Sequence, residues 1–114
     1  MSDMFVDATR SEGDLAGVLE VDGETSYFYL YRTGAADPKI LGAIHVASGV
    51  PSFDERDVQV TWDAAEDRVG LFIKSHLWAL FDVRTNVRLG GNYVEGGESP
   101  IPKEVARGFA RRKP

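Results

Sequence analysis

The chain contains no cysteine, only two histidines and no long apolar run in its 114 residues. The absence of cysteine excludes disulfide bonds, thiolate metal sites and cysteine nucleophiles. Because no apolar stretch approaches the roughly 20 residues of a membrane-spanning helix, no association with a membrane is expected. The first residues are acidic where a signal peptide has a basic flank and an apolar segment, which predicts a cytoplasmic protein.

Motifs that specify a chemistry are also missing. No serine lies in a nucleophile-elbow pattern. The glycine pairs at 90–91 and 96–97 are not followed by the Gly-Lys-Ser/Thr of a phosphate-binding loop. His45 and His76 lack the spacing of metal ligands. We therefore expect no metal and no cofactor, and the residues favour a protein that is not an enzyme.

Charge is distributed unevenly along the chain, whose net charge is −5. Residues 1–67 hold 14 acids and 4 bases, whereas residues 68–114 hold 4 acids and 9 bases. The acidic part favours a basic protein partner. A nucleic-acid-binding domain usually carries a basic excess, so no nucleic-acid partner is expected. The basic residues near the C-terminus are interpreted as a solvated helix end.

Residues 58–93 alternate between apolar and polar side chains in short runs that are separated by polar turns, which is typical of an antiparallel meander. Upstream strands are expected over 15–20, 26–31 and 40–47, with a tight hairpin turn at Asp22-Gly23. The strand over 40–47 is apolar on both faces, which favours a central, covered position. Gly90-Gly91 indicates a bulge or a close backbone approach.

A single domain over residues 1–114 is expected from the length of the chain. Residues 1–13 are polar and aperiodic, which predicts a mobile tail. Ile101, Val105 and Phe109 form one apolar stripe, so a C-terminal helix is expected over 100–112. The predicted fold is mainly β (α+β), a bent antiparallel sheet or small sandwich of about six to seven strands with one C-terminal helix.

Three tyrosines, Tyr27, Tyr29 and Tyr31, alternate along one predicted strand and so share one face. Tyrosine is enriched at recognition surfaces because it combines apolar area with a polar tip. Trp78 is expected opposite the face of Leu77, Ala79 and Phe81, and it is a candidate for the same surface. The alternative is that these rings pack under the helix or loops.

Two polar residues are candidates for a pocket. His45 lies within an apolar strand, and Asp82 lies among aromatic side chains, where a raised pKa would suit an acid or a base. A pocket between the sheet and the helix would need both on one face and within hydrogen-bond reach. Asp82 is more often an acceptor for the amides of the following turn, here residues 84–86.

Three segments carry a resemblance to a known family, and they are DGETSYFYLY, ILGAIHV and the block VQVTW…VGLFI…LWALFDV…GGNY. Together they resemble a family of small uncharacterised bacterial domains over residues 18–93. The resemblance implies a bacterial source and a small β-rich fold. The family has no assigned activity, cofactor or catalytic residue.

The sequence therefore favours a non-catalytic protein-binding or accessory module that uses an aromatic sheet face. The alternative hypothesis is a small enzyme or ligand-binding protein with a pocket around His45 and Asp82. A homodimer that forms through a free sheet edge is compatible with either hypothesis.

Overall fold

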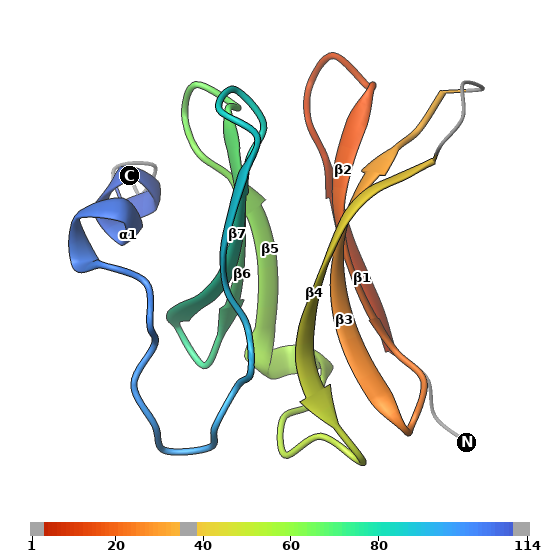
Figure 1. Cartoon of the computed structure of the whole chain (residues 1–114), viewed down its shortest axis with the longest axis vertical. Helices are drawn as coiled ribbons and strands as arrows, with labels where there is room; N and C mark the ends of the chain where they lie inside the picture. Colours follow the sequence, from red (N-terminus) through yellow and green to blue (C-terminus); the bar gives the residue numbers. More distant parts are fainter. Residues whose placement is uncertain (1–3, 35–38, 111–114) are drawn as a thin grey trace.

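The computed structural model describes residues 4–34 and 39–110, which form a sandwich of two four-stranded antiparallel sheets (Figure 1). Sheet A contains, in spatial order, β1 (Met4–Thr9), β2 (Leu15–Val21), β3 (Thr25–Arg32) and β4 (Ile40–Ser48). The 3₁₀ helix η1 (Glu55–Asp57) leads into sheet B, which contains β5 (Val58–Trp62), β6 (Arg68–Ile73), β7 (His76–Asp82) and β8 (Val87–Gly90). The helix α1 (Lys103–Ala110) follows sheet B. Of the two predicted architectures the sandwich is correct, with eight strands in place of six to seven.

The two sheets share one apolar interior, to which both contribute alternate side chains. Leu19 and Phe28 of sheet A and Leu71 and Ile73 of sheet B are fully buried. The rings of Phe28 and Phe81 meet across the interface, with their centroids 5.4 Å apart. The burial of these side chains, at roughly 25 cal/mol per Å² of apolar area, is the main force that holds the sheets together.

Part of the expected N-terminal tail is the edge strand β1. Met4, Val6 and Ala8 pack against the shared interior, whereas the residues between them are exposed. The indole N–H of Trp62 donates to the carbonyl oxygen of Ala8 at 2.9 Å, which joins the two sheets at this edge. The prediction of a mobile tail was wrong for residues 4–9, because only three apolar residues alternate there and the residues between them are mostly polar. Residues 1–3 lie outside the described residues.

Strand β4 lies at the edge of sheet A, so the expectation that it is central was wrong. Its outer edge is paired instead by the chain that leaves β8. The N–H of Asn92 donates to the oxygen of His45 at 2.9 Å, and the N–H of Tyr93 donates to the oxygen of Val46 at 2.7 Å. The chain therefore crosses from sheet B to sheet A.

The crossing requires glycine at two successive positions. Gly90 and Gly91 have φ values of +89° and +107°. A Cβ atom would lie 2.2 Å from the oxygen of Trp78 at the first position and 2.7 Å from the oxygen of His45 at the second. The predicted close backbone approach at this pair is confirmed.

A bulge in β7 changes the direction of Trp78. Leu71 pairs with Ala79 and Phe72 pairs with Leu77, so Trp78 is an extra residue without a partner on β6. Trp78 and Ala79 consequently both belong to the interior, whereas Leu77 faces α1. The expected common face of Leu77, Ala79 and Phe81 was wrong, because one inserted residue reverses the alternation.

Helix α1 covers the outer face of sheet B (Figure 1). The predicted stripe is confirmed, with Ile101 and Phe109 buried and Val105 partly buried. Gly70 leaves room for the helix, because a Cβ atom there would lie 3.2 Å from the ring of Phe109. The helix begins at Lys103 and not at residue 100 as predicted, and positions 111–112 of the prediction lie outside the described residues. Within the described parts of the chain, no helix is long and apolar enough to cross a membrane.

Candidate binding groove

The outer face of sheet A is formed by three rows of side chains that run across its four strands. The register gives these rows as Phe5, Glu20, Tyr27 and His45; Asp7, Val18, Tyr29 and Ala43; and Thr9, Ala16, Tyr31 and Ile40. The predicted common face of the three tyrosines is therefore confirmed. None of the described helices and strands lies over this face (Figure 1).

A groove of about 330 Å³ runs along β2 on this face. Its floor consists of Ala16 and Val18, which are only 3% and 7% exposed although no element covers them. They are shielded by longer side chains on both sides. Phe5, Asp7 and Thr9 of β1 form one wall, and Tyr29 and Tyr31 of β3 form the other. The small residues on β2 between longer ones on its neighbours thus create the hollow.

Aromatic contacts hold the wall of the groove in place. The rings of Tyr27 and Tyr29 are stacked with their centroids 5.9 Å apart. Tyr27 also meets the ring of His45 edge-on at 5.5 Å. Cross-strand and same-strand ring contacts of this kind each contribute about 0.5–1.5 kcal/mol. These contacts orient the rings of Tyr27 and Tyr29 in the unbound chain.

Among the described residues, the charged groups that line the groove are both carboxylates, Asp7 and Glu20. Within residues 4–34 and 39–110, no lysine or arginine lines it. Burial raises the pKa of Tyr29, and the negative charges of Glu20 and Asp22 raise it further. This part of the face therefore has a negative potential, which favours cationic groups.

Trp78 does not take part in this surface. It is 3% exposed and lies between the sheets, where its ring meets that of Tyr93 edge-on at 4.8 Å. The interpretation that it joins the tyrosines is wrong, because the bulge in β7 directs it inwards.

His45 and Asp82 are on different sheets. His45 lines a depression of about 330 Å³ beside the crossing segment, and Asp82 lines another of about 320 Å³ beside β8. Neither depression is lined by α1, so the hypothesis of a shared pocket between sheet and helix is wrong. The two residues are separated because β4 and β7 lie in opposite layers of the sandwich.

Asp82 has the structural role that its sequence context favoured. It accepts the N–H groups of Arg84 and Thr85 at 3.0 and 3.1 Å, and it pairs with Arg68 at 2.9 Å. Burial opposes ionisation of this carboxyl, but the hydrogen bond from Arg68 and those of the turn outweigh it and lower its pKa. A lowered pKa does not suit a general acid at neutral pH.

His45 connects two polar side chains in a series. One ring nitrogen lies 3.0 Å from the amide oxygen of Asn92, and the other lies 3.0 Å from the hydroxyl of Ser48. This is the order of an orienting group, a base and a nucleophile. Acyl-transfer sites of the α/β-hydrolase type also use the N–H of the residue after the nucleophile as an oxyanion donor. That N–H, of Gly49, instead donates to the oxygen of Glu24 at 2.6 Å. What the contacts of His45 do is join β4 to the crossing segment.

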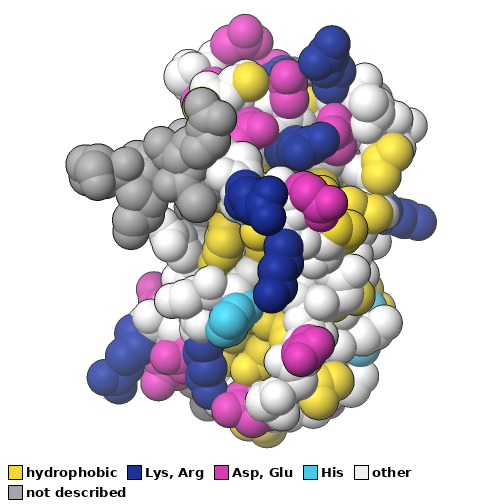
Figure 2. Space-filling model, turned by 90° about the vertical axis from the view of Figure 1, so that its left-hand side faces the viewer, with side chains coloured by type: hydrophobic (Ala, Val, Ile, Leu, Met, Phe, Trp, Pro, Cys, Tyr) yellow, Lys and Arg dark blue, Asp and Glu magenta, His cyan; other side chains and the backbone are white. Residues whose placement is uncertain are grey.

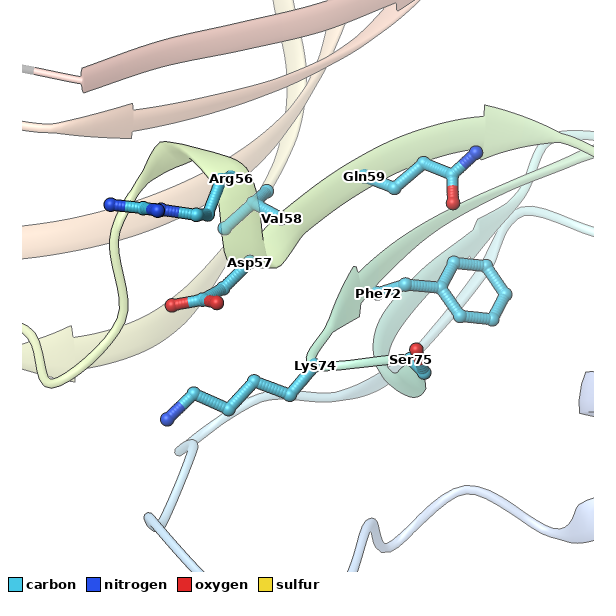
Figure 3. Close-up of a pocket in the computed structure, with 7 residues that line it drawn as sticks. All are labelled: Arg56, Asp57, Val58, Gln59, Phe72, Lys74 and Ser75. Carbon is cyan, nitrogen blue, oxygen red and sulfur yellow. The ribbon is translucent and has the colours of Figure 1, made fainter.

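A larger depression, of about 580 Å³, lies at the ends of β5 and β6. Figure 3 shows that its side chains diverge, with Arg56, Asp57 and Lys74 on one side and Gln59 and Phe72 on the other. Lys74 is already paired with Glu95 at 2.9 Å. Without converging polar groups this hollow is a weaker candidate than the groove on sheet A.

The opposite side of the molecule, which carries α1, has a different character. Figure 2 shows lysine and arginine side chains near the middle of that side, with acidic and hydrophobic side chains around them. Among the residues that the structure describes, no group of three or more His, Asp or Glu side chains is placed to hold a metal ion.

Of the residues that line the groove, sequence reasoning found only Tyr29 and Tyr31 and missed the others, among them Phe5 and Asp7 on β1. Phe5 is 61% exposed and is the most exposed aromatic side chain on this face. The alternation of Met4, Val6 and Ala8 is typical of a strand. So short a pattern does not by itself predict a strand, because it is stable only when a partner strand lies beside it. The hairpin of β2 and β3 supplies that partner.

Comparison with known proteins gives one match. A family described as uncharacterized protein conserved in bacteria (DUF2251) matches residues 2–93, which include both sheets and the crossing segment but not α1. No curated protein and no solved structure matches the chain. The match confirms the resemblance to small uncharacterised bacterial domains. The chain belongs to this bacterial family of uncharacterized proteins.

Proposed function

We propose that the chain is a non-catalytic binding module that holds a basic partner protein on the outer face of sheet A. The observation that carries this proposal is the difference between the two outer faces. The apolar outer side chains of sheet B lie beneath α1, whereas the groove of sheet A has an apolar floor and no covering element among the described residues.

The composition of the open face supports a protein partner. Tyrosine side chains dominate the binding energy of many interfaces, because each buries a large rigid area and keeps a polar tip. Two exposed apolar side chains flank the groove, Phe5 at 61% and Ile40 at 50% exposure. The stacked Tyr27 and Tyr29 lose little conformational freedom on binding, which lowers the cost of association.

The charge of the face supports a basic partner. As far as the structure describes the chain, its groove is lined by two carboxylates and by no base, and further acids, Asp22 and Glu24, lie in the adjoining turn. Opposite charges on two partners speed their encounter and exclude acidic competitors. The acidic character of residues 1–67 extends this field beyond the groove.

The test is affinity capture from a lysate of the native host with three forms of the tagged chain. These are the natural chain, the double variant Tyr29→Ser/Tyr31→Ser, and a control, Val94→Ser, whose side chain is 60% exposed outside the groove. We expect a stoichiometric basic protein to bind the natural chain and the control. Loss of two central aromatic side chains should weaken its binding by about 30-fold or more, which corresponds to about 2 kcal/mol.

Two results would contradict the proposal. One is a partner that binds the double variant as tightly as the natural chain. The other is a partner that is lost equally from the control, because the capture would then not depend on this face. Circular dichroism of all three forms verifies that each is folded, since the substituted side chains lie outside the shared interior.

A further inference from the structure

The two carboxylates of the groove occupy neighbouring positions around Val18. The register places Asp7 directly across from Val18 on β1, and Glu20 follows Val18 by two residues on the same face of β2. Tyr29 lies directly across from Val18 on the other side. Val18 is therefore surrounded by two acids and one aromatic ring, with the small side chain of Ala16 next along the floor.

These acids have no internal counter-ion. Among the described residues, neither Asp7 nor Glu20 forms a salt bridge or a side-chain hydrogen bond. Two acids in the turns of this sheet are engaged, in contrast. Asp14 is paired with Arg10 at 2.8 Å, and Asp22 accepts the amides of its own turn. The two groove carboxylates are thus available to a cation from outside.

The lining of the groove suits a guanidinium group better than an ammonium group. A guanidinium group is planar, stacks on aromatic rings and donates in a fork to carboxylates, whereas an ammonium group is a compact and strongly hydrated charge. An arginine side chain also has a methylene stem that packs on apolar surface. The groove has a contact for each of these properties: an apolar floor for the stem, an aromatic wall for the planar face and two carboxylates for the N–H donors.

We infer that the groove takes an arginine side chain of the partner protein, with its stem over Ala16 and Val18 and its guanidinium between Asp7 and Glu20 against the ring of Tyr29. This inference rests on the proposed function, because the arginine is supplied by the protein that binds sheet A. It defines the partner as a protein that presents an exposed arginine on its contact surface.

The probe is the short peptide acetyl-Gly-Arg-Gly-amide, titrated into the isotopically labelled chain and followed by amide chemical shifts. We expect saturable shifts confined to the strands around the groove, at Asp7, Val18 and Tyr29. The citrulline peptide has the same shape without the charge and should bind about tenfold more weakly. The lysine peptide should also bind more weakly, because it cannot stack and fork at once.

A charge-matched pair of variants separates the groove from the overall charge. Asp7→Asn/Glu20→Gln should reduce the affinity for the arginine peptide about tenfold. Glu98→Gln/Glu104→Gln removes the same charge from exposed acids outside the groove and should leave the affinity unchanged. All four substitutions keep the size of the side chain, so the fold is expected to persist.

Each other outcome overturns the inference. Absence of saturable binding, shifts centred on η1 or α1, equal binding of the citrulline or lysine peptide, or equal loss in both double variants would do so. A captured partner that needs Tyr29 and Tyr31 but tolerates Asp7→Asn/Glu20→Gln would overturn the arginine and leave the proposed function intact. A partner that ignores the tyrosines would overturn the proposed function itself.

Discussion

Replacement of Gly91 by alanine is expected to lower the free energy of unfolding by about 4 kcal/mol. Two effects add at this position. The φ of +107° is unfavourable for a side chain, at a cost of about 1–3 kcal/mol. The new Cβ would also lie 2.7 Å both from the oxygen of His45 and from a methyl group of Ile44, and overpacking of this kind costs about 1–3 kcal/mol.

Gly96 provides the matched control, because it separates strain from crowding. Its φ is +76°, and nothing lies within 4 Å of the position where a Cβ would be. Gly96→Ala should therefore cost only about 1 kcal/mol. In urea, the unfolding midpoint of Gly91→Ala should fall by about 2 M with an unchanged slope, if the slope is about 2 kcal/mol per M. Equal midpoints for the two variants would show that the chain does not cross between the sheets as closely as described.

Three further predictions concern other contacts. Trp62→Phe removes the donor to Ala8 and should cost about 1–2 kcal/mol in urea unfolding, with faster amide exchange in β1. Phe109→Ala should cost about 3 kcal/mol and expose the outer face of sheet B, which dye binding would detect. Hydrogen bonds from Lys74, the largest cause, and from Tyr93 and Ser52 lower the pKa of Glu95 from 4.5 to about 2, so this carboxyl stabilises the fold above pH 4.5 and the effect is lost as the pH falls towards 2. In Lys74→Met the carboxyl should titrate nearer 4.5 by NMR, and an unchanged titration would contradict the pairing.

Features with a local cause were predictable from the sequence. The hairpin turn at Asp22-Gly23 was expected from the preference of such turns for a positive φ at both central residues. The structure has the hairpin, with a φ of +90° at Gly23 alone and a connection over residues 22–24. The face shared by Tyr27, Tyr29 and Tyr31 follows from the period of two along an unbulged strand. The stripe of α1 follows in the same way from the helical period.

Features that depend on distant parts of the chain were not predictable in this way. Strand β1 is recognisable only when β2 is beside it, so Phe5 and Asp7 were missed. The bulge at Trp78 arises from the pairing between β6 and β7, and no single residue in the sequence predicts it. His45 and Asp82 looked compatible along the sequence, but the division into two sheets separates them. The groove depends both on the local alternation of the tyrosines and on the pairing of distant strands. For this reason the sequence predicted only its tyrosine wall.

The two sheets shield the apolar side chains of their outer faces from water in different ways. Sheet B places large aliphatic and aromatic side chains outward, and these need the cover of α1. Sheet A shields a small apolar floor with tyrosines and carboxylates, whose polar ends remain in water. Such a face is stable without a cover, because its apolar area is already partly buried by its own side chains. A partner can therefore dock there without displacing any part of the fold, and its binding energy is not spent on opening the protein.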